Sequence, residues 1–178
     1  LPEFAEKYGI VVCNDIDDMR SHLVSLGFTN TFIDDVDLYN KNIFNPNTLI
    51  YTIYDDYGRP VAFMARYLVY DGLVDEETGK FIKGPKFIGS KSTLKFNIYR
   101  KNERLYLLNV EKKQGRPIYI VEGNSDAVSL HINGVTNSVA ICGLGLNELH
   151  FDTLRRNNCY DIVLCFDNDE AGKTKGRK

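Results

Sequence analysis

Residues 118–123 read Ile-Tyr-Ile-Val-Glu-Gly, an apolar run that ends in an acid and a glycine. Residues 162–169 read Ile-Val-Leu-Cys-Phe-Asp-Asn-Asp, a second apolar run with acids at its end. Short continuous apolar runs are typical of strands buried on both faces of a parallel sheet. In open α/β sheets, ligands bind at the carboxyl ends of such strands. The two runs therefore predict a parallel sheet with carboxylates at its ligand-binding edge.

The residues between the two runs predict alternating helices and strands. We expect helices at 125–132 and 147–156, capped by Asn124 or Ser125 and by Asn147, and a strand at 138–141. The resulting β-α-β-α-β order requires parallel strands and right-handed crossovers. The side chains expected to face the sheet from the second helix are Leu149, Phe151 and Leu154.

The upstream part has a different pattern. Residues 17–26 predict a helix that Gly27 ends, and two strand-like runs, 49–54 and 61–67, flank the turn residues 55–60. This arrangement predicts an antiparallel hairpin. The polar, Gly- and Pro-containing segment 112–117 marks the expected boundary between an α+β domain and the α/β domain.

Composition excludes several classes of protein. The net charge is −2 and 43% of residues are hydrophobic, so the chain has enough apolar material for a packed core. The four cysteines form no C-x-x-C pair, which argues against a zinc ribbon, and Cys142 and Cys165 are expected to be buried. The sequence shows no signal-peptide pattern and no membrane-length apolar run. We expect a cytoplasmic protein with no membrane association.

Three carboxylates are the candidate metal ligands: Glu122, Asp167 and Asp169. Mg²⁺ is commonly held by a few carboxylates, with waters and substrate phosphates completing its coordination. Gly123 lets the backbone turn directly after the first strand. The alternative interpretation is that these acids only cap helices.

Three cations upstream are candidate phosphate contacts: Arg66, Lys86 and Lys101. The two lysines stand among aromatic residues, and such a mixture suits a nucleotide or a nucleic-acid strand. A solvated basic face is the alternative for any one of them. The three histidines share no ligand spacing, so we expect them to be core or surface residues.

The combination resembles a known family. Segments 121–127 and 165–172 are similar to the two halves of a Toprim domain, and Gly143 matches the loop after its second strand. Segments 57–66 and 85–90, and Lys101 before Leu105-Tyr106, are similar to the catalytic core of DnaG-type primases. The resemblance implies an α+β N-terminal subdomain with an antiparallel hairpin over 1–115, and a Toprim α/β subdomain with a parallel sheet over 116–178.

The resemblance also implies a function: template-directed synthesis of RNA primers on single-stranded DNA from nucleoside triphosphates. Mg²⁺ or Mn²⁺ would be the cofactor, held by the catalytic residues Glu122, Asp167 and Asp169. The implied nucleotide or template contacts are Arg66, Lys86 and Lys101, and the supporting residues are Gly123, Asp126 and Gly143. A replicative helicase would bind through regions outside this chain.

Some residues depart from the family pattern. Met64 and Ala65 stand in place of expected glycines, and Leu107 replaces another, which indicates a phage or mobile-element relative. The chain ends at Lys178, so we expect a fragment truncated within the Toprim domain, with an incomplete and inactive site. The alternatives are a Toprim-family nuclease or topoisomerase-like protein that cleaves phosphodiesters, and a non-catalytic single-strand-binding remnant.

Overall fold

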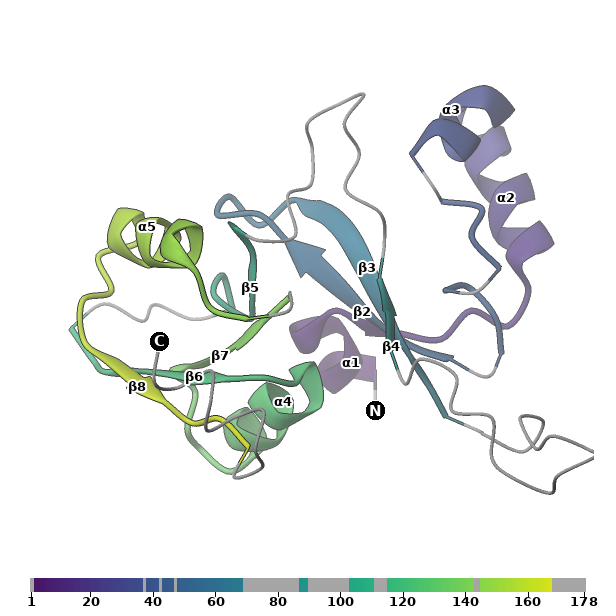
Figure 1. The fold of residues 1–178 in the computed structure, drawn as a ribbon. Coiled ribbons are helices and arrows are strands. Elements are labelled where there is room, and N and C mark those ends of the chain that lie inside the picture. Colours follow the sequence, from purple (N-terminus) through teal and green to yellow (C-terminus); the bar gives the residue numbers. More distant parts are fainter. Residues whose placement is uncertain are drawn as a thin grey trace, which may run out of the picture. The chain divides into compact units, whose positions relative to one another are not determined.

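The computed structural model describes residues 2–36, 38–41, 43–46, 48–68, 87–89, 103–110, 115–142 and 145–167 (Figure 1). The chain divides into two compact units, one formed by 1–52 and 62–93, the other by 53–61 and 94–178. The expected boundary at 115–116 stays a prediction, since these units group the residues in another way. None of the described helices has the length and apolar character needed to cross a membrane.

The first unit is built on an antiparallel sheet with the strand order β1-β2-β3-β4. Strand β1 pairs with β2 and β3 pairs with β4, both antiparallel. The strands are β1 (Ile10–Val11), β2 (Thr48–Tyr54), β3 (Pro60–Tyr67) and β4 (Phe87–Gly89), and the helices are α1 (Pro2–Tyr8), α2 (Ile16–Ser25) and α3 (Asn30–Asp35). The predicted hairpin is confirmed, with strands that begin one residue earlier than expected.

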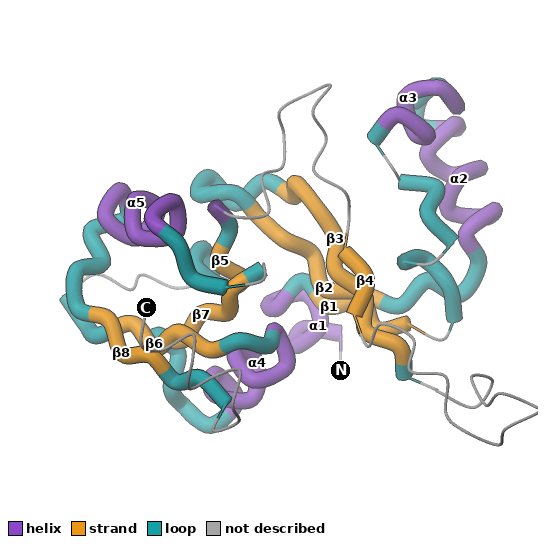
Figure 2. The backbone as a smooth tube through the Cα atoms, viewed as in Figure 1, coloured by secondary structure: helices purple, strands orange, loops and turns teal. Residues whose placement is uncertain are grey.

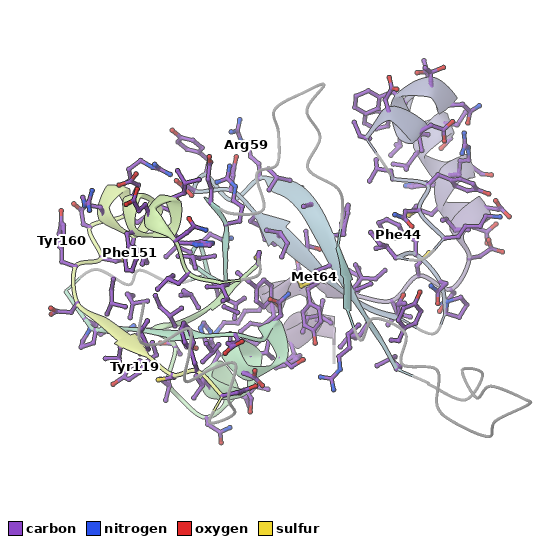
Figure 3. All side chains as sticks on the ribbon, in the orientation of Figure 1. Phe44, Arg59, Met64, Tyr119, Phe151 and Tyr160 are labelled. Carbon is purple, nitrogen blue, oxygen red and sulfur yellow. The ribbon has the colours of Figure 1, made fainter. Side chains whose placement is uncertain are left out.

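Helix α2 begins and ends one residue earlier than the sequence predicts, and Gly27 follows it as expected. The side chain of Asp15 accepts the backbone N–H of Asp17 at 2.7 Å and that of Asp18 at 3.3 Å, which caps the first turn. Gly27 follows the helix with a φ of +95°, a conformation that glycine adopts without steric cost. The first unit's core includes Phe44, whose ring meets that of Phe63 edge-on at 5.0 Å (Figure 3).

The turn between β2 and β3 is organised by one carboxylate. The buried side chain of Asp55 accepts the backbone N–H groups of Tyr57 and Arg59, each at 2.9 Å, and pairs with the Arg59 guanidinium at 2.7 Å. Burial raises the pKa of Asp55, but the hydrogen bonds from Arg59 and Tyr57 outweigh it and leave that pKa below its ordinary value. Gly58 supplies the positive φ that the turn needs.

The second unit contains a mostly parallel sheet with two helices (Figure 2). Its elements are β5 (Leu105–Tyr106), β6 (Ile118–Val121), α4 (Asn124–Ile132), β7 (Ser138–Ile141), α5 (Glu148–Arg156) and β8 (Ile162–Leu164). The strand order is β5-β7-β6-β8, in which β6 pairs in parallel with β7 and β8, while β5 is antiparallel to β7. The predicted β-α-β-α-β order is confirmed, and β5 adds an antiparallel edge strand that the pattern did not predict.

The two crossovers run in opposite directions from the centre of this sheet. The chain moves from β6 to β7 through α4, then returns past β6 to β8 through α5. Because both crossovers are right-handed, the two helices must lie on opposite faces. Figure 1 shows α4 and α5 on opposite sides of the sheet. Leu154 of α5 packs on Ile118, Ile120, Val139 and Ile141, while Ala127 of α4 is buried on the other face.

Helix α4 begins one residue earlier than expected. Its N-cap is Gly123, which has no side chain, and not Asn124 or Ser125. Within the helix, the buried His131 lies with Nε2 2.9 Å from the carbonyl oxygen of Ser138 on β7. This contact ties the last turn of α4 to the sheet, so the interpretation of His131 as a core histidine is confirmed.

Helix α5 turns a different face to the sheet from the one predicted. Leu149 and Phe151 are exposed, whereas His150 and Thr153 are buried beside Leu154. The Thr153 hydroxyl donates to the carbonyl of Glu103 at 3.0 Å, and His150 Nδ1 accepts the N–H of Asn147 at 3.3 Å. Polar residues take core positions here because the segment before β5 offers backbone groups for them to bind.

Cys165 is exposed, so the prediction that it is buried is wrong, while Cys142 is buried as expected. Cys165 follows β8, which lies at the edge of the sheet order, and Val163 and Leu164 are exposed as well. An apolar run predicts a buried strand only where neighbours cover both faces and both edges, and β8 lacks that cover among the described residues.

Asp55→Ala should lower the free energy of unfolding by about 1–2 kcal/mol at pH 7, because two turn N–H groups and Arg59 lose their acceptor. A carboxyl group whose pKa is lowered in the folded state stabilises the protein fully at pH values above its unfolded-state pKa of about 4. This stabilisation disappears as the pH falls through the folded-state pKa. Urea unfolding from pH 7 to 3 should therefore show a shrinking difference between parent and variant. Asp152→Ala, in an exposed ion pair with Arg155, should change stability by less than about 0.5 kcal/mol. An undiminished Asp55→Ala difference at pH 3 would contradict this assignment.

His150→Gln should make stability less dependent on pH between 5 and 7. Burial lowers the pKa of His150, partly offset by the backbone of Arg104, so the unfolded chain takes up a proton before the folded protein does. Parent stability therefore falls as the pH drops below about 6.5, and the variant lacks this component. Glutamine suits the position of His150 in the capping box of α5, and its side chain does not titrate. Urea unfolding at several pH values measures the difference, and His22→Gln on the exposed surface of α2 serves as the helix control. Equal slopes for parent and His150→Gln would contradict the assignment.

Candidate functional site: the carboxyl edge of the parallel sheet

Two connections that lead to opposite faces of the sheet start beside each other, at the carboxyl ends of β6 and β7. The connection after β6 leads to α4 and the one after β7 leads to α5, on the opposite face. Adjacent strands whose connections leave in opposite directions open a crevice at their carboxyl ends, where α/β proteins bind ligands. Glu122 and Gly123 directly follow β6 and therefore lie at this position.

The carboxyl end of β8 lies beside that of β6. The register pairs Ile118 with Ile162 and Ile120 with Leu164, and Cys165 donates its N–H to the carbonyl of Ile120 at 2.8 Å. Asp167 follows two residues later and is exposed. The fold thus brings the ends of the two acid-bearing runs to neighbouring positions on one edge, as the sequence predicts.

Gly123 allows a close contact within this edge. A Cβ atom at this position would come within 2.5 Å of Oδ2 of Asp126, which belongs to the first turn of α4. A larger residue at this position would therefore displace the Asp126 carboxylate from its place over the start of the helix. A carboxylate in the first turn also interacts favourably with the helix dipole. The supporting roles of Gly123 and Asp126 stay predictions.

The other predicted site residues divide into two groups. Arg66 lies on β3 in the first unit, opposite Phe87 of β4 in the register. Lys86, Lys101, Gly143 and Asp169 lie outside the described residues. Among the residues that the structure does describe, no group of three or more His, Cys, Asp or Glu side chains could hold a metal ion. The roles of all these residues stay predictions.

One cluster near the β2–β3 turn was missed by the sequence analysis. Asp56 accepts a hydrogen bond from Arg104 at 3.4 Å and lies 3.9 Å from Arg156 of α5. Arg156 also donates to the Thr153 hydroxyl at 2.9 Å. Asp56 and Arg104 are 48 residues apart, so no local pattern could have paired them.

The comparisons with known proteins agree with this architecture. A family model described as Toprim-like matches residues 119–177. The DNA primase of Mycolicibacterium smegmatis is 27% identical over 176 residues, which cover 91% of this chain and 26% of that protein. The chain therefore spans about a quarter of the length of this relative.

Solved structures show the same fold over nearly the whole chain. The RNA polymerase domain of Mycobacterium tuberculosis primase DnaG has a TM-score of 0.78 and 25% identity, covering 99% of this chain and 58% of that one. A DnaG primase catalytic domain bound to single-stranded DNA has a TM-score of 0.75 and 21% identity, covering 99% and 53%. Taken together with the strand-end acids and the sheet order, these matches show that the chain is similar in sequence and fold to the RNA polymerase domain of DnaG-type DNA primases, including its Toprim-like region.

Proposed function

We propose that this chain carries the catalytic site for template-directed synthesis of RNA primers on single-stranded DNA. The observation that carries the proposal is the position of Glu122 at the carboxyl end of the central strand β6, beside the end of β8 and Asp167. The similarity to DNA primases supports it, as does a primase catalytic domain of the same fold bound to single-stranded DNA.

The donor set at the strand ends suits a hard divalent cation. Glu122 and Asp167 supply carboxylate oxygens, which Mg²⁺ and Mn²⁺ prefer, and Asp169 would add a third carboxylate. Such a cation would neutralise the triphosphate and favour ionisation of the attacking hydroxyl group. Asp126, held over Gly123, would help to orient the carboxylates around it.

Three cations, Arg66 and Lys86 of the first unit and Lys101 of the second, would hold the other substrates. Arg66, Lys86 and Lys101 would bind phosphates of the template strand or of the incoming nucleotide. These contacts position the strand without reading its sequence. A replicative helicase would bind through parts of the protein outside this chain.

Glu122→Gln and Asp167→Asn should each reduce primer synthesis by about a hundredfold or more in the full-length protein, because each removes a charged ligand at the transferring phosphate. Incorporation of labelled ribonucleotides on single-stranded DNA with Mg²⁺ or Mn²⁺ measures this. Asp161→Asn, an exposed acid at the opposite end of β8, is the matched control and should keep the parent rate. Parent-like synthesis by both site variants would refute the metal assignment, and strand cleavage without synthesis would favour the nuclease alternative.

Arg66→Ala should weaken binding of single-stranded DNA to a similar extent for different sequences. Because the variant neutralises one phosphate fewer, the slope of log affinity against log salt concentration should also fall by about one. Fluorescence anisotropy of a labelled oligonucleotide at several salt concentrations tests both. Arg116→Ala, an exposed arginine before β6, should leave the slope unchanged. An unchanged slope for Arg66→Ala would place Arg66 outside the template path.

A further inference from the structure

The turn between β2 and β3 displays an aromatic ring to solvent. Tyr57 is 84% exposed, more than any other large hydrophobic side chain in the described part of the chain. Aromatic rings usually cover apolar surface, and Tyr is enriched where proteins bind partners. The formation of the turn alone therefore does not explain why this ring is exposed to solvent.

Two carboxylates hold the turn that carries Tyr57. Asp55 accepts the N–H groups of Tyr57 and Arg59. The neighbouring Asp56 binds Arg104 and approaches Arg156 of α5. A side chain presented from a fixed backbone loses less conformational entropy when it binds, so this arrangement is prepared for a contact.

One face of the ring is already covered by a cation. The Arg59 guanidinium lies 5.1 Å from the centre of the Tyr57 ring, while Asp55 holds the same guanidinium at 2.7 Å. The high exposure of Tyr57 means that its opposite face is open. Figure 3 labels Arg59 at this turn, and its side chain is itself 72% exposed. The ring is thus a flat surface supported from behind by a guanidinium that is itself held in place.

An open aromatic face with guanidinium groups beside it matches the chemistry of an unpaired nucleotide. Bases stack on aromatic rings whatever their identity, and arginines add electrostatic attraction for the phosphates. Arg156 can contribute positive charge to this attraction. It shares the Asp56 carboxylate with Arg104 and lies 3.9 Å from it. Its charge is therefore only partly compensated.

We propose that Tyr57 is a stacking platform for a base of single-stranded nucleic acid, supported by Arg59, and that Arg156, which approaches the preceding residue Asp56, attracts the phosphates of the same strand. The proposal rests on the proposed function, because it takes the template strand as the partner. It adds a contact at the β2–β3 turn, at residues that the predicted template contacts Arg66, Lys86 and Lys101 do not include. Stacking would hold the strand at one point without selecting a sequence.

The chain contains no tryptophan, which makes a direct optical test possible. Tyr57→Trp places a single fluorophore at the turn, and titration with oligothymidine should quench its emission as bases stack on the indole. Tyr160→Trp is the matched control, because Tyr160 is 70% exposed on the loop between α5 and β8 (Figure 3). Its emission should stay unchanged over the same titration.

Anisotropy of a labelled oligothymidine, measured in parallel on the 178-residue chain, separates this proposal from the proposed function. Tyr57→Ala should bind about fivefold more weakly or worse, Tyr57→Phe should bind like the parent, and Tyr160→Ala should be unaffected. Binding by the parent with no quenching in Tyr57→Trp and no weakening in Tyr57→Ala would overturn the stacking platform and leave the proposed function standing. Absence of binding by the parent would overturn both. Because Tyr57 is exposed, all three of its variants should fold, and circular dichroism checks this.

Discussion

The parallel pairing of β6 with both of its neighbours is the constraint on which the second unit depends. With β7 on one side of β6 and β8 on the other, the right-handed crossover from β6 to β7 and the one from β7 past β6 to β8 must run in opposite directions. That requirement places α4 and α5 on opposite faces and opens the carboxyl end of β6 between them. The alternation of Ile118 and Ile120 with Tyr119 and Val121 then distributes apolar side chains to both faces. Glu122 reaches the ligand-binding edge because it is the next residue after the last buried strand position.

A second set of interactions fastens the β2–β3 turn into the same unit. Asp55 shapes the turn from within, and Asp56 joins it to Arg104 and Arg156. Arg104 stands just before β5, where His150 and Thr153 of α5 are also buried. The hairpin turn, the start of β5 and helix α5 thus share one network of polar contacts. This network gives the exposed Tyr57 its fixed backbone, which the proposed stacking contact requires.

The sequence predicted what depends on local pattern and missed what depends on distant partners. The strands at 118–121 and 138–141, the helix cap Asn147 and the turn at 55–60 follow from apolar runs and turn residues a few positions apart. His150 and Asp56 do not, because the groups they bind lie some 50 residues away in sequence. Leu149, Phe151 and Cys165 were expected to be buried from hydrophobicity alone, but exposure depends on which face α5 turns inward and on what covers β8. The positions of Glu122 and Asp167 at one sheet edge were predictable because parallel strands align their carboxyl ends.

We propose that the acids after β6 and β8 bind one divalent cation. Titration of the ¹⁵N-labelled chain with Mn²⁺ tests this directly, since the paramagnetic ion broadens amide signals according to their distance from it. Broadening should be strongest at Gly123 and Phe166, beside Glu122 and Asp167, and should decline along β6 and β8 toward Ile118 and Ile162. Broadening centred instead on another group of acids, such as Asp15, Asp17 and Asp18 at the start of α2, would contradict it.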